Sequence, residues 1–183
     1  MDSKLQIISG IWRGKKLFLP HGARPTQNMA RAALFNMMTA GLWPDGDLMV
    51  WDAFAGSGAF GIECLSRYPE CHVVFTDVAP HTVRRNLANL CIDARARLIG
   101  ADAMTRIAEI VPTANVIFVD PPYADPDTGA AFVRRVGRVA NAGTILIWEQ
   151  EASSPRIPDG DTWDTLRDKT YGRARFLILR RRA

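Results

Sequence analysis

The chain has 183 residues, a formal net charge of +4, 48% hydrophobic residues and 23% charged residues. These values are typical of one globular domain and exclude a disordered, collagen-like or disulfide-rich protein. No apolar run approaches the roughly 20 residues of a membrane helix, and the first residues lack the apolar block of a signal peptide. We therefore expect a cytoplasmic protein whose three cysteines are reduced thiols that bind no metal.

The basic residues gather at the two ends of the chain. Residues 1–36 contain six basic groups and one acid, residues 37–150 contain nine basic groups and thirteen acids, and residues 151–183 contain eight basic groups and five acids. Most of the basic residues are arginines, whose planar guanidinium binds phosphate bidentately. This distribution suggests a polyanionic partner. On charge alone, an ordinary solvated surface explains it equally well.

The first 40 residues differ in pattern from the rest. Residues 5–20 predict a small β-hairpin, and residues 27–39 predict a helix with apolar positions at helical spacing. Both segments precede the regular alternation that begins at residue 48.

From residue 48 onward, short apolar runs alternate with amphipathic stretches. The runs predict strands at residues 48–54, 72–77, 96–100, 115–120 and 143–150. The intervening stretches predict helices at residues 57–67, 80–91, 103–111 and 128–140. Continuous apolar strands separated by helices indicate a parallel sheet covered on both faces, which is a doubly wound α/β fold. Residues 162–172 and 173–181 then predict an antiparallel hairpin at the sheet edge.

The first central strand ends in a glycine-rich turn. Gly56, Gly58 and Gly61 form a G-x-G-x-x-G pattern between a strand and a helix, which is the context of a dinucleotide-binding fingerprint. Asp77 ends the next strand about 20 residues on, where an acid can accept hydrogen bonds from ribose hydroxyls; a cap or loop acid is the alternative. Asp52 precedes the glycines, and Asp-x-Phe-x-Gly-Ser-Gly resembles the first motif of S-adenosylmethionine-dependent methyltransferases rather than that of dehydrogenases.

The fourth central strand ends in Asp120-Pro121-Pro122-Tyr123. Two prolines cannot continue a central strand, so the chain leaves the sheet at its carboxyl edge, where open α/β sheets bind ligands. The exocyclic amine of a base is a poor nucleophile because its lone pair is conjugated with the ring. Acceptors on Asp120 and on the Pro121 carbonyl would hold its two N–H groups, and Tyr123 would stack on a base. The alternative is a rigid proline turn preceded by an acid.

The sequence resembles a known family at these motifs. Asp120-Pro121-Pro122-Tyr123 resembles the (Asp/Asn)-Pro-Pro-(Tyr/Phe) motif of amino-group methyltransferases. Together with residues 52–58 and the N-terminal segments at 7–17, 24–26, 31 and 34–36, it is similar to the bacterial 16S ribosomal RNA guanine-N2 methyltransferase family. The usual target of that family is guanine 966 of small-subunit RNA. The resemblance extends from Leu5 to Arg181.

The resemblance implies a class I S-adenosylmethionine-dependent methyltransferase fold, which is a Rossmann-like, mostly parallel seven-stranded sheet with a C-terminal antiparallel hairpin. Residues 1–40 would form a basic RNA-binding extension of hairpin plus helix, and residues 41–183 the catalytic domain. The cofactor, S-adenosylmethionine, would be held by Asp52, Phe54, Gly56, Gly58, Asp77, Asp102 and Ala103. A helix cap is an equally good role for Asp102. RNA phosphates would be contacted by Arg13, Lys15, Lys16, Arg24 and Arg31.

The implied function is methylation of the N2 amine of a guanine in 16S ribosomal RNA by a monomeric enzyme. It would act on the small ribosomal subunit or its assembly intermediate, without a metal or a membrane. Two alternatives stay open: an adenine-N6 methyltransferase of DNA or RNA, and a non-catalytic RNA-binding assembly factor. A DNA methyltransferase would need a sequence-reading domain for which 183 residues leave no room, and the intact motifs argue against a non-catalytic protein.

The chain departs from the family pattern at two positions. Ala32 stands where the family usually has a glutamate, so the role of that carboxylate is lost or moved. Ala79 stands near the usual place of a second acid, which leaves Asp77 as the ribose-binding candidate.

Overall fold

Strands and helices alternate through the residues that the computed structural model describes, which are 5–20, 28–92, 94–122 and 124–183. The strands are Met49–Asp52 (β1), His72–Asp77 (β2), Ala96–Gly100 (β3), Val116–Val119 (β4), Ile145–Glu151 (β5), Trp163–Tyr171 (β6) and Ala174–Arg181 (β7). The helices are Asn28–Thr39 (α1), Ala59–Arg67 (α2), His81–Asn89 (α3), Ile107–Ile110 (α4) and Pro126–Gly137 (α5). None of these helices is long and apolar enough to cross a membrane.

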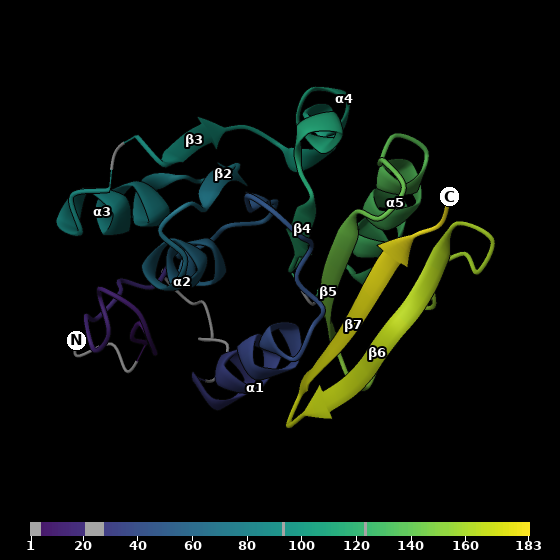
Figure 1. The fold of residues 1–183 in the computed structure, drawn as a ribbon, viewed down its shortest axis with the longest axis horizontal. Coiled ribbons are helices and arrows are strands. Elements are labelled where there is room, and N and C mark those ends of the chain that lie inside the picture. Colours follow the sequence, from purple (N-terminus) through teal and green to yellow (C-terminus); the bar gives the residue numbers. More distant parts are fainter. Residues whose placement is uncertain (1–4, 21–27, 93, 123) are drawn as a thin grey trace.

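The seven strands form one sheet in the order β3-β2-β1-β4-β5-β7-β6 (Figure 1). Strands β1 to β5 run parallel, and β7 pairs antiparallel with both β5 and β6. The order reverses at β1, from which the chain first builds outward through β2 and β3 and then returns to β4. The predicted fold class is therefore confirmed, including the C-terminal hairpin.

The predicted helix over residues 103–111 is wrong as a single element. In the structure a 3-10 turn at Ala103–Thr105 precedes the short α4, and a second 3-10 turn follows at Val111–Thr113. The side chain of Asp102 accepts a hydrogen bond from the backbone N–H of Met104, which caps the first turn. Pro112 lacks the N–H that would continue the α-helical ladder beyond α4.

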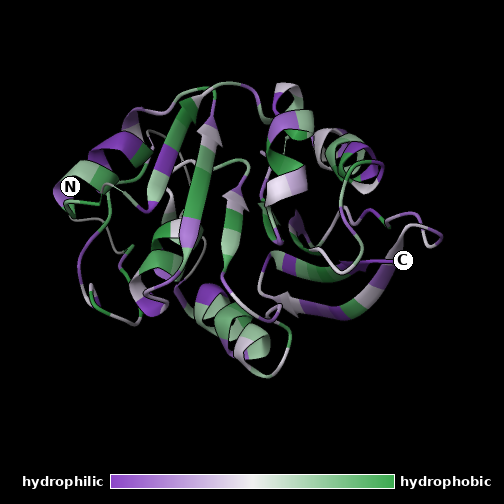
Figure 2. Cartoon of the chain, turned by 45° about the horizontal axis from the view of Figure 1, so that its top comes forward, coloured by the Kyte–Doolittle hydropathy of each residue, from purple (hydrophilic) through white to green (hydrophobic). Residues whose placement is uncertain are grey.

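Apolar side chains alternate across the strands and form one core on each face of the sheet. Val50 and Phe118 belong to the core beneath α1, α2 and α3, whereas Trp51 and Ile117 belong to the core beneath α4 and α5. Figure 2 shows hydrophobic residues along the central strands, and both hydrophobic and hydrophilic residues along the helices that cover them. Burial on both faces explains why these strands read as continuous apolar runs in the sequence.

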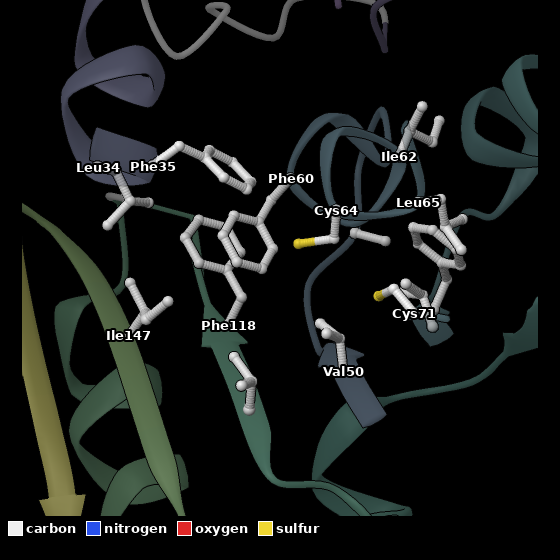
Figure 3. Packing of buried hydrophobic residues seen from close by; sticks show 14 of the residues in the cluster. Leu34, Phe35, Val50, Phe60, Ile62, Cys64, Leu65, Cys71, Phe118 and Ile147 are labelled. Atoms are coloured by element: carbon white, nitrogen blue, oxygen red, sulfur yellow. The ribbon is translucent and has the colours of Figure 1, made fainter. Parts of the chain in front are cut away.

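An aromatic stack fixes two helices over the carboxyl end of β4 (Figure 3). The ring of Phe60 on α2 stacks on Phe118 of β4, with centroids 4.0 Å apart and planes 11° from parallel. Phe35 of α1 lies 5.4 Å from Phe60 between ring centroids. Because Phe118 lies two residues before Asp120, this packing positions α1 and α2 above the Asp-Pro-Pro turn.

The N-terminal residues 5–20 form a hairpin-like turn with one antiparallel bridge, between Gln6 and Lys16, instead of two full strands. Leu5, Ile7 and Leu17 are buried in the core that α1 and α2 share. The extension and the main body therefore have a common core, and the proposed domain boundary at residue 40 stays a prediction.

We expect Phe118→Ala to lower the free energy of unfolding by about 3–5 kcal/mol, because it removes a buried ring that stacks on Phe60 of α2. Urea denaturation followed by circular dichroism measures this change. Ile157→Ala, at a side chain that is 84% exposed, is the control and should change it by less than about 0.5 kcal/mol. A loss below about 1 kcal/mol for Phe118→Ala would contradict the central role of the stack.

Candidate active site

The glycine-rich turn joins the end of β1 to the start of α2. Gly56 and Gly58 have φ angles of +53° and +76°, in the left-handed region that favours glycine. A Cβ at Gly58 would also lie 2.8 Å from Val83 Cγ2 on α3. Gly61 serves packing instead, because its added Cβ would lie 2.4 Å from Phe75 Cε1 on β2. The spacing of the three glycines is therefore required by backbone conformation and close helix–sheet contact.

Asp77, at the end of β2, holds this turn in place. Its Oδ2 accepts a hydrogen bond from the backbone N–H of Gly56 at 2.7 Å, and its Oδ1 accepts one from that of Ala79 at 2.7 Å. Each carboxylate oxygen keeps further acceptor capacity. The spacing in the sequence predicted a ribose-binding acid at Asp77. In the structure its carboxylate lies next to the glycine turn, and two hydrogen bonds fix its orientation.

Asp52, the last residue of β1, is 1% exposed. Its Oδ2 accepts a hydrogen bond from the backbone N–H of Gly61 at 3.0 Å. Burial raises the pKa of this carboxyl to about 7; the hydrogen bond from Gly61 opposes the rise, and the charge of Asp77 adds to it. The group is therefore poised between its charged and neutral forms near neutral pH.

Three further positions were predicted to bind the cofactor. Asp102 is exposed and caps the 3-10 turn that follows β3, so its structural role is established and its ligand role stays a prediction. Ala103 is buried in the core beneath α4. Phe54 is half-buried and packs edge-on against Phe132 of α5, with ring centroids 5.2 Å apart. The contact with Phe132 holds Phe54, which lies two residues before Gly56, against α5.

These positions fit the predicted cofactor, S-adenosylmethionine. Asp77 offers two oriented acceptors for the ribose hydroxyls, and Asp102 follows the neighbouring strand with an exposed carboxylate. The glycine turn leaves space, since the nearest heavy atom to a Cβ placed on Gly56 is Pro20 Cγ at 4.0 Å. Among the described residues, no group of three or more histidine, cysteine or acidic side chains is arranged to bind a metal ion.

The Asp-Pro-Pro turn follows β4 at the same edge of the sheet. Pro121 is buried, and a Cβ on Gly129 of α5 would lie 2.9 Å from Pro121 Cγ, so the turn packs closely on that helix. Asp120 is half-buried, and its carboxylate hydrogen-bonds to no other described residue. Its pKa is raised well above the ordinary value by burial and then by the charges of Glu149 and Asp52. Tyr123 lies outside the described residues.

Glu149 is a site residue that the sequence analysis missed. It lies on β5 and is 2% exposed. A small pocket next to the Asp-Pro-Pro turn is lined by residues that include Pro121, Pro122, Trp148 and Glu149. The available signal was an acid directly after the apolar run of residues 145–148, because acids are almost never fully buried without a reason.

The basic side chains Arg13, Lys15 and Lys16 are exposed on the N-terminal turn. Ser66 of α2 holds this turn, since its hydroxyl donates to the Ser9 carbonyl at 2.7 Å and accepts from the Trp12 N–H at 3.1 Å. The three predicted RNA contacts thus project from a firmly attached turn. Arg24, also predicted to bind RNA, lies outside the described residues.

The prediction that Arg31 contacts RNA is corrected by the structure, because its side chain is only 3% exposed. Its guanidinium donates to the Gln6 carbonyl and to Asn28 Oδ1, and Nε lies 3.7 Å from Glu63 Oε2. Burial lowers its pKa, and the charge of Glu63 opposes that effect. Arg31 therefore stabilises the fold beneath the N-terminal turn.

Glu63 of α2 is the centre of this buried cluster and was also missed. Its carboxylate accepts hydrogen bonds from the N–H groups of Ile8 and Ser9 at 2.8 and 2.9 Å, and from Arg67 Nε at 2.7 Å. A carboxylate thus lies beside Arg31, although it comes from α2 and not from residue 32. As with Glu149, the available signal in the sequence was a charged residue among buried neighbours, here on a helix.

Asn86 of α3 joins the N-terminal segment to the glycine turn. Its amide nitrogen donates to the carbonyls of Phe18 and Ser57 at 3.0 and 2.8 Å, and its oxygen accepts from the Phe18 N–H at 2.8 Å. The guanidinium of Arg85 lies 3.5 Å above the Phe18 ring. The basic segment and the glycine turn therefore share one buried amide.

Asp52 makes stability depend on pH. Its pKa is about 7 in the folded chain against 3.8 for an ordinary aspartate, so the folded state binds this proton more tightly than the unfolded state. The free energy of unfolding should therefore fall as pH rises from about 4 to about 7. Asp52→Asn carries no charge and should remove this part of the decline, which is on the order of a few kcal/mol.

Urea unfolding at several pH values between 4 and 8 measures this effect. We expect Asp52→Asn to gain stability relative to the unsubstituted chain as pH rises. Asp45→Asn, at an exposed acid, is the control and should follow the unsubstituted curve. If the Asp52→Asn and unsubstituted curves run parallel over the whole range, the elevated pKa of Asp52 is wrong.

Comparisons with known proteins agree with this geometry. The chain matches the family model described as Conserved hypothetical protein 95 over residues 5–180. Ribosomal RNA small subunit methyltransferase D of Escherichia coli strain K12 is 33% identical over 189 residues, which is 100% of this chain and 92% of that protein. The protein of the same name from Haemophilus influenzae is 29% identical over 178 residues, with 92% of this chain and 90% of that protein covered.

Solved structures have the same fold. The Escherichia coli protein yhhF superposes with a TM-score of 0.77 at 31% identity, and 98% of each chain is covered. The rRNA methyltransferase aviRa of Streptomyces viridochromogenes has a TM-score of 0.67 at 16% identity over 90% of this chain and 88% of that one, a likeness of fold alone. The sheet is thus that of the class I S-adenosylmethionine-dependent methyltransferases. The chain belongs to the family described as Conserved hypothetical protein 95.

Proposed function

We propose that this protein transfers a methyl group from S-adenosylmethionine to the N2 amine of a guanine in 16S ribosomal RNA, at position 966. The observation that carries the proposal is the placement of the Asp-Pro-Pro turn beside the glycine turn, at the carboxyl edge of one parallel sheet. The names of the relatives in Escherichia coli and Haemophilus influenzae support ribosomal RNA as the substrate class.

The glycine turn would bind the cofactor, and the Asp-Pro-Pro turn would bind the target base. When bound, S-adenosylmethionine supplies an electrophilic methyl group. Asp77 would hold the ribose hydroxyls and Asp102 the adenine amino group, while the glycine turn brings its backbone close to the ligand. Fixing the methyl donor and the base on one rigid edge turns a reaction between two molecules into one within a complex, which is a large share of the rate gain available here.

Asp120 and the Pro121 carbonyl would accept hydrogen bonds from the two N–H groups of the target amine. These bonds favour a more tetrahedral nitrogen whose lone pair is directed at the methyl group. The carboxylate of Asp120 is available for this role, because it accepts no hydrogen bond from the other described residues. Tyr123, by its place in the motif, would stack on the base.

The N-terminal turn would bind the phosphates that flank the target. Arg13, Lys15 and Lys16 are exposed together on a turn attached to α2, the helix that begins at the glycine turn. We propose a small-subunit assembly intermediate or the small subunit as the partner, and a monomeric enzyme that works in the cytoplasm.

Transfer of labelled methyl groups to small-subunit particles from cells that lack the protein tests the proposed function. We expect incorporation at one guanine, found by nuclease digestion and mass spectrometry of the RNA. Label on adenine, or on large-subunit RNA alone, would overturn the proposed specificity. No incorporation into any particle or naked RNA, with the cofactor bound, would overturn the proposed activity.

We expect Asp120→Ala to lower methyl transfer by at least about a hundredfold, because it removes an acceptor that acts on the reacting nitrogen. Calorimetry should find S-adenosylmethionine binding nearly unchanged, since Asp120 follows β4 and not the glycine turn. Asp125→Ala, at an exposed acid that caps α5, is the matched control and should keep most of the activity. Near-normal turnover by Asp120→Ala would contradict the proposed role.

Reversal of charge at two positions, Arg13→Glu with Lys15→Glu, should weaken RNA binding and flatten its salt dependence. Loss of two phosphate contacts reduces the slope of log K against log salt by about 1 to 2. Filter binding from 50 to 300 mM salt measures the slope. The control reverses two exposed residues of β6, Arg167→Glu with Lys169→Glu. An unchanged slope for the first pair would remove the N-terminal turn from the RNA interface.

A further inference from the structure

The proposed function leaves one buried acid without a task, Glu149. Strands β4 and β5 are parallel neighbours, and Val119 is in register with Trp148. Asp120 directly follows β4 and Glu149 is the next residue of β5, so the two residues lie close together, and the charge of Glu149 acts on Asp120.

The same face of the sheet carries both side chains. Phe118 and Ile147 belong to the core beneath α1 and α2, and Asp120 and Glu149 follow them by two residues on the same strands. The interaction of Asp120 with the charge of Glu149 agrees with this arrangement. On β7 the residue opposite Glu149 is the uncharged Phe176.

Other charged groups also approach this pair from the elements packed against it. They are Asp52 from β1, whose charge acts on Asp120, and Arg31 from α1, which interacts with the charge of Glu149 and itself lies near Glu63 and Arg67 of α2. Of the acids, Asp52 is bonded to the Gly61 N–H, and Glu63 to two backbone N–H groups and Arg67. Asp120 differs from them because its oxygens accept no hydrogen bond within the described part of the chain.

Methylation of an exocyclic amine has to dispose of a proton. The amine nitrogen uses its lone pair to form the new N–C bond, and the electrons of the breaking S–C bond return to sulfur. The nitrogen then carries a positive charge and one hydrogen too many, and it becomes neutral when this proton leaves. An oxygen that already accepts a hydrogen bond from that nitrogen is the nearest acceptor.

We propose that Asp120 accepts this proton, and that Glu149 is a positioning residue that keeps Asp120 basic enough to do so. The proposal rests on the proposed methyl transfer to an amine. A second negative charge on the adjacent strand favours a proton on Asp120, because two close carboxylates in a poorly hydrated place ionise together only at a high cost. Glu149 itself is buried and acts through Asp120. The proton then passes to solvent when the product leaves.

The carboxylate pair also helps to account for the raised pKa of Asp120, at a site where the bound methyl donor would be cationic. A carboxylate with an ordinary pKa would be a weak proton acceptor at neutral pH. Burial and the Glu149 charge both move the pKa of Asp120 upward, toward the range in which a general base is most effective. Asp77 and Asp102 are instead held by backbone N–H groups.

Glu149→Gln tests the proposal, because it keeps the shape of the side chain and removes its charge. The titration of Asp120 is followed by 13C NMR of the labelled carboxyl group in the protein alone. We expect the Asp120 midpoint to move to lower pH, since a neighbouring negative charge no longer opposes ionisation. Glu151→Gln, on the same strand at an acid paired with Arg173, should leave that midpoint in place.

Single-turnover methyl transfer as a function of pH is the second readout. For Glu149→Gln the acid limb of the rate profile should move to lower pH, and the plateau should fall by roughly tenfold because Asp120 is a weaker base. Glu149→Asp keeps the charge and should return the limb toward its original position. A role in folding alone would change stability or rate but would not move the limb.

The outcomes separate this proposal from the proposed function. If the Asp120 midpoint and the acid limb of Glu149→Gln both coincide with those of the unsubstituted chain, Glu149 does not tune Asp120 and the proposal is wrong. If methyl transfer to RNA fails while the Asp120 midpoint falls as expected, the carboxylate pair stands and the proposed substrate is wrong. Should Glu149→Gln not fold, the titration of Asp120 in the unsubstituted chain decides the matter: a midpoint at the ordinary value of an aspartate overturns the proposal.

Discussion

The parallel direction of five strands concentrates negative charge at one edge of the sheet. The acids that reach this edge are Asp52, Asp77, Asp102, Asp120 and Glu149. Charges of one sign at close range destabilise the folded chain unless other groups compensate. Backbone N–H groups compensate the three acids nearest the glycine turn and the turn after β3. Asp120 follows β4 and accepts no hydrogen bond from the other described residues, and it lies where the chemistry is proposed to occur.

A second constraint acts on the opposite side of α2. The buried carboxylate of Glu63 binds the backbone of the N-terminal turn and the side chains of two arginines. Removal of one partner from such a cluster is costly because it leaves a buried charge without compensation. The exposed basic residues of the turn are thus presented by a firmly held backbone. The helix that begins at the glycine turn carries the N-terminal segment on its other face.

The sequence predicts most of the fold because the strands are buried on both faces and end in recognisable turns. The bounds of β2 and β3 agree with the prediction, and Asp52, Asp77 and Asp120 lie where the ends of parallel strands require. Arg31 was assigned to the RNA interface because of its charge, and its position on the buried side of the predicted helix was not considered. The buried positions of α1 are residues 30, 31, 34, 35 and 38, a helical stripe that includes this arginine. The pattern was present in the sequence, but only the partner Glu63 makes its burial possible.

Other parts of the site depend on contacts that no local pattern contains. The pairing of Asp120 with Glu149 follows from the register of two strands that lie 25 residues apart in the chain. The loss of a continuous helix after β3 depends on a cap and a proline acting together. Such features are decided by tertiary neighbours, so they become visible only once the sheet order is known.

The bridge made by Asn86 affects how genetic data on this protein should be interpreted. One amide bonds the backbone at Phe18 and at Ser57, so it joins the segment that is proposed to bind RNA to the glycine turn that is proposed to bind the cofactor. Under the proposed function, a substitution at this position would disturb the binding of both RNA and the cofactor through one side chain. A variant there that fails to bind RNA would not identify Asn86 as part of the RNA interface, and a variant that fails to bind the cofactor would not identify it as a ligand. In a mutational map, this residue would then appear in both functional classes because of its backbone contacts at Phe18 and Ser57.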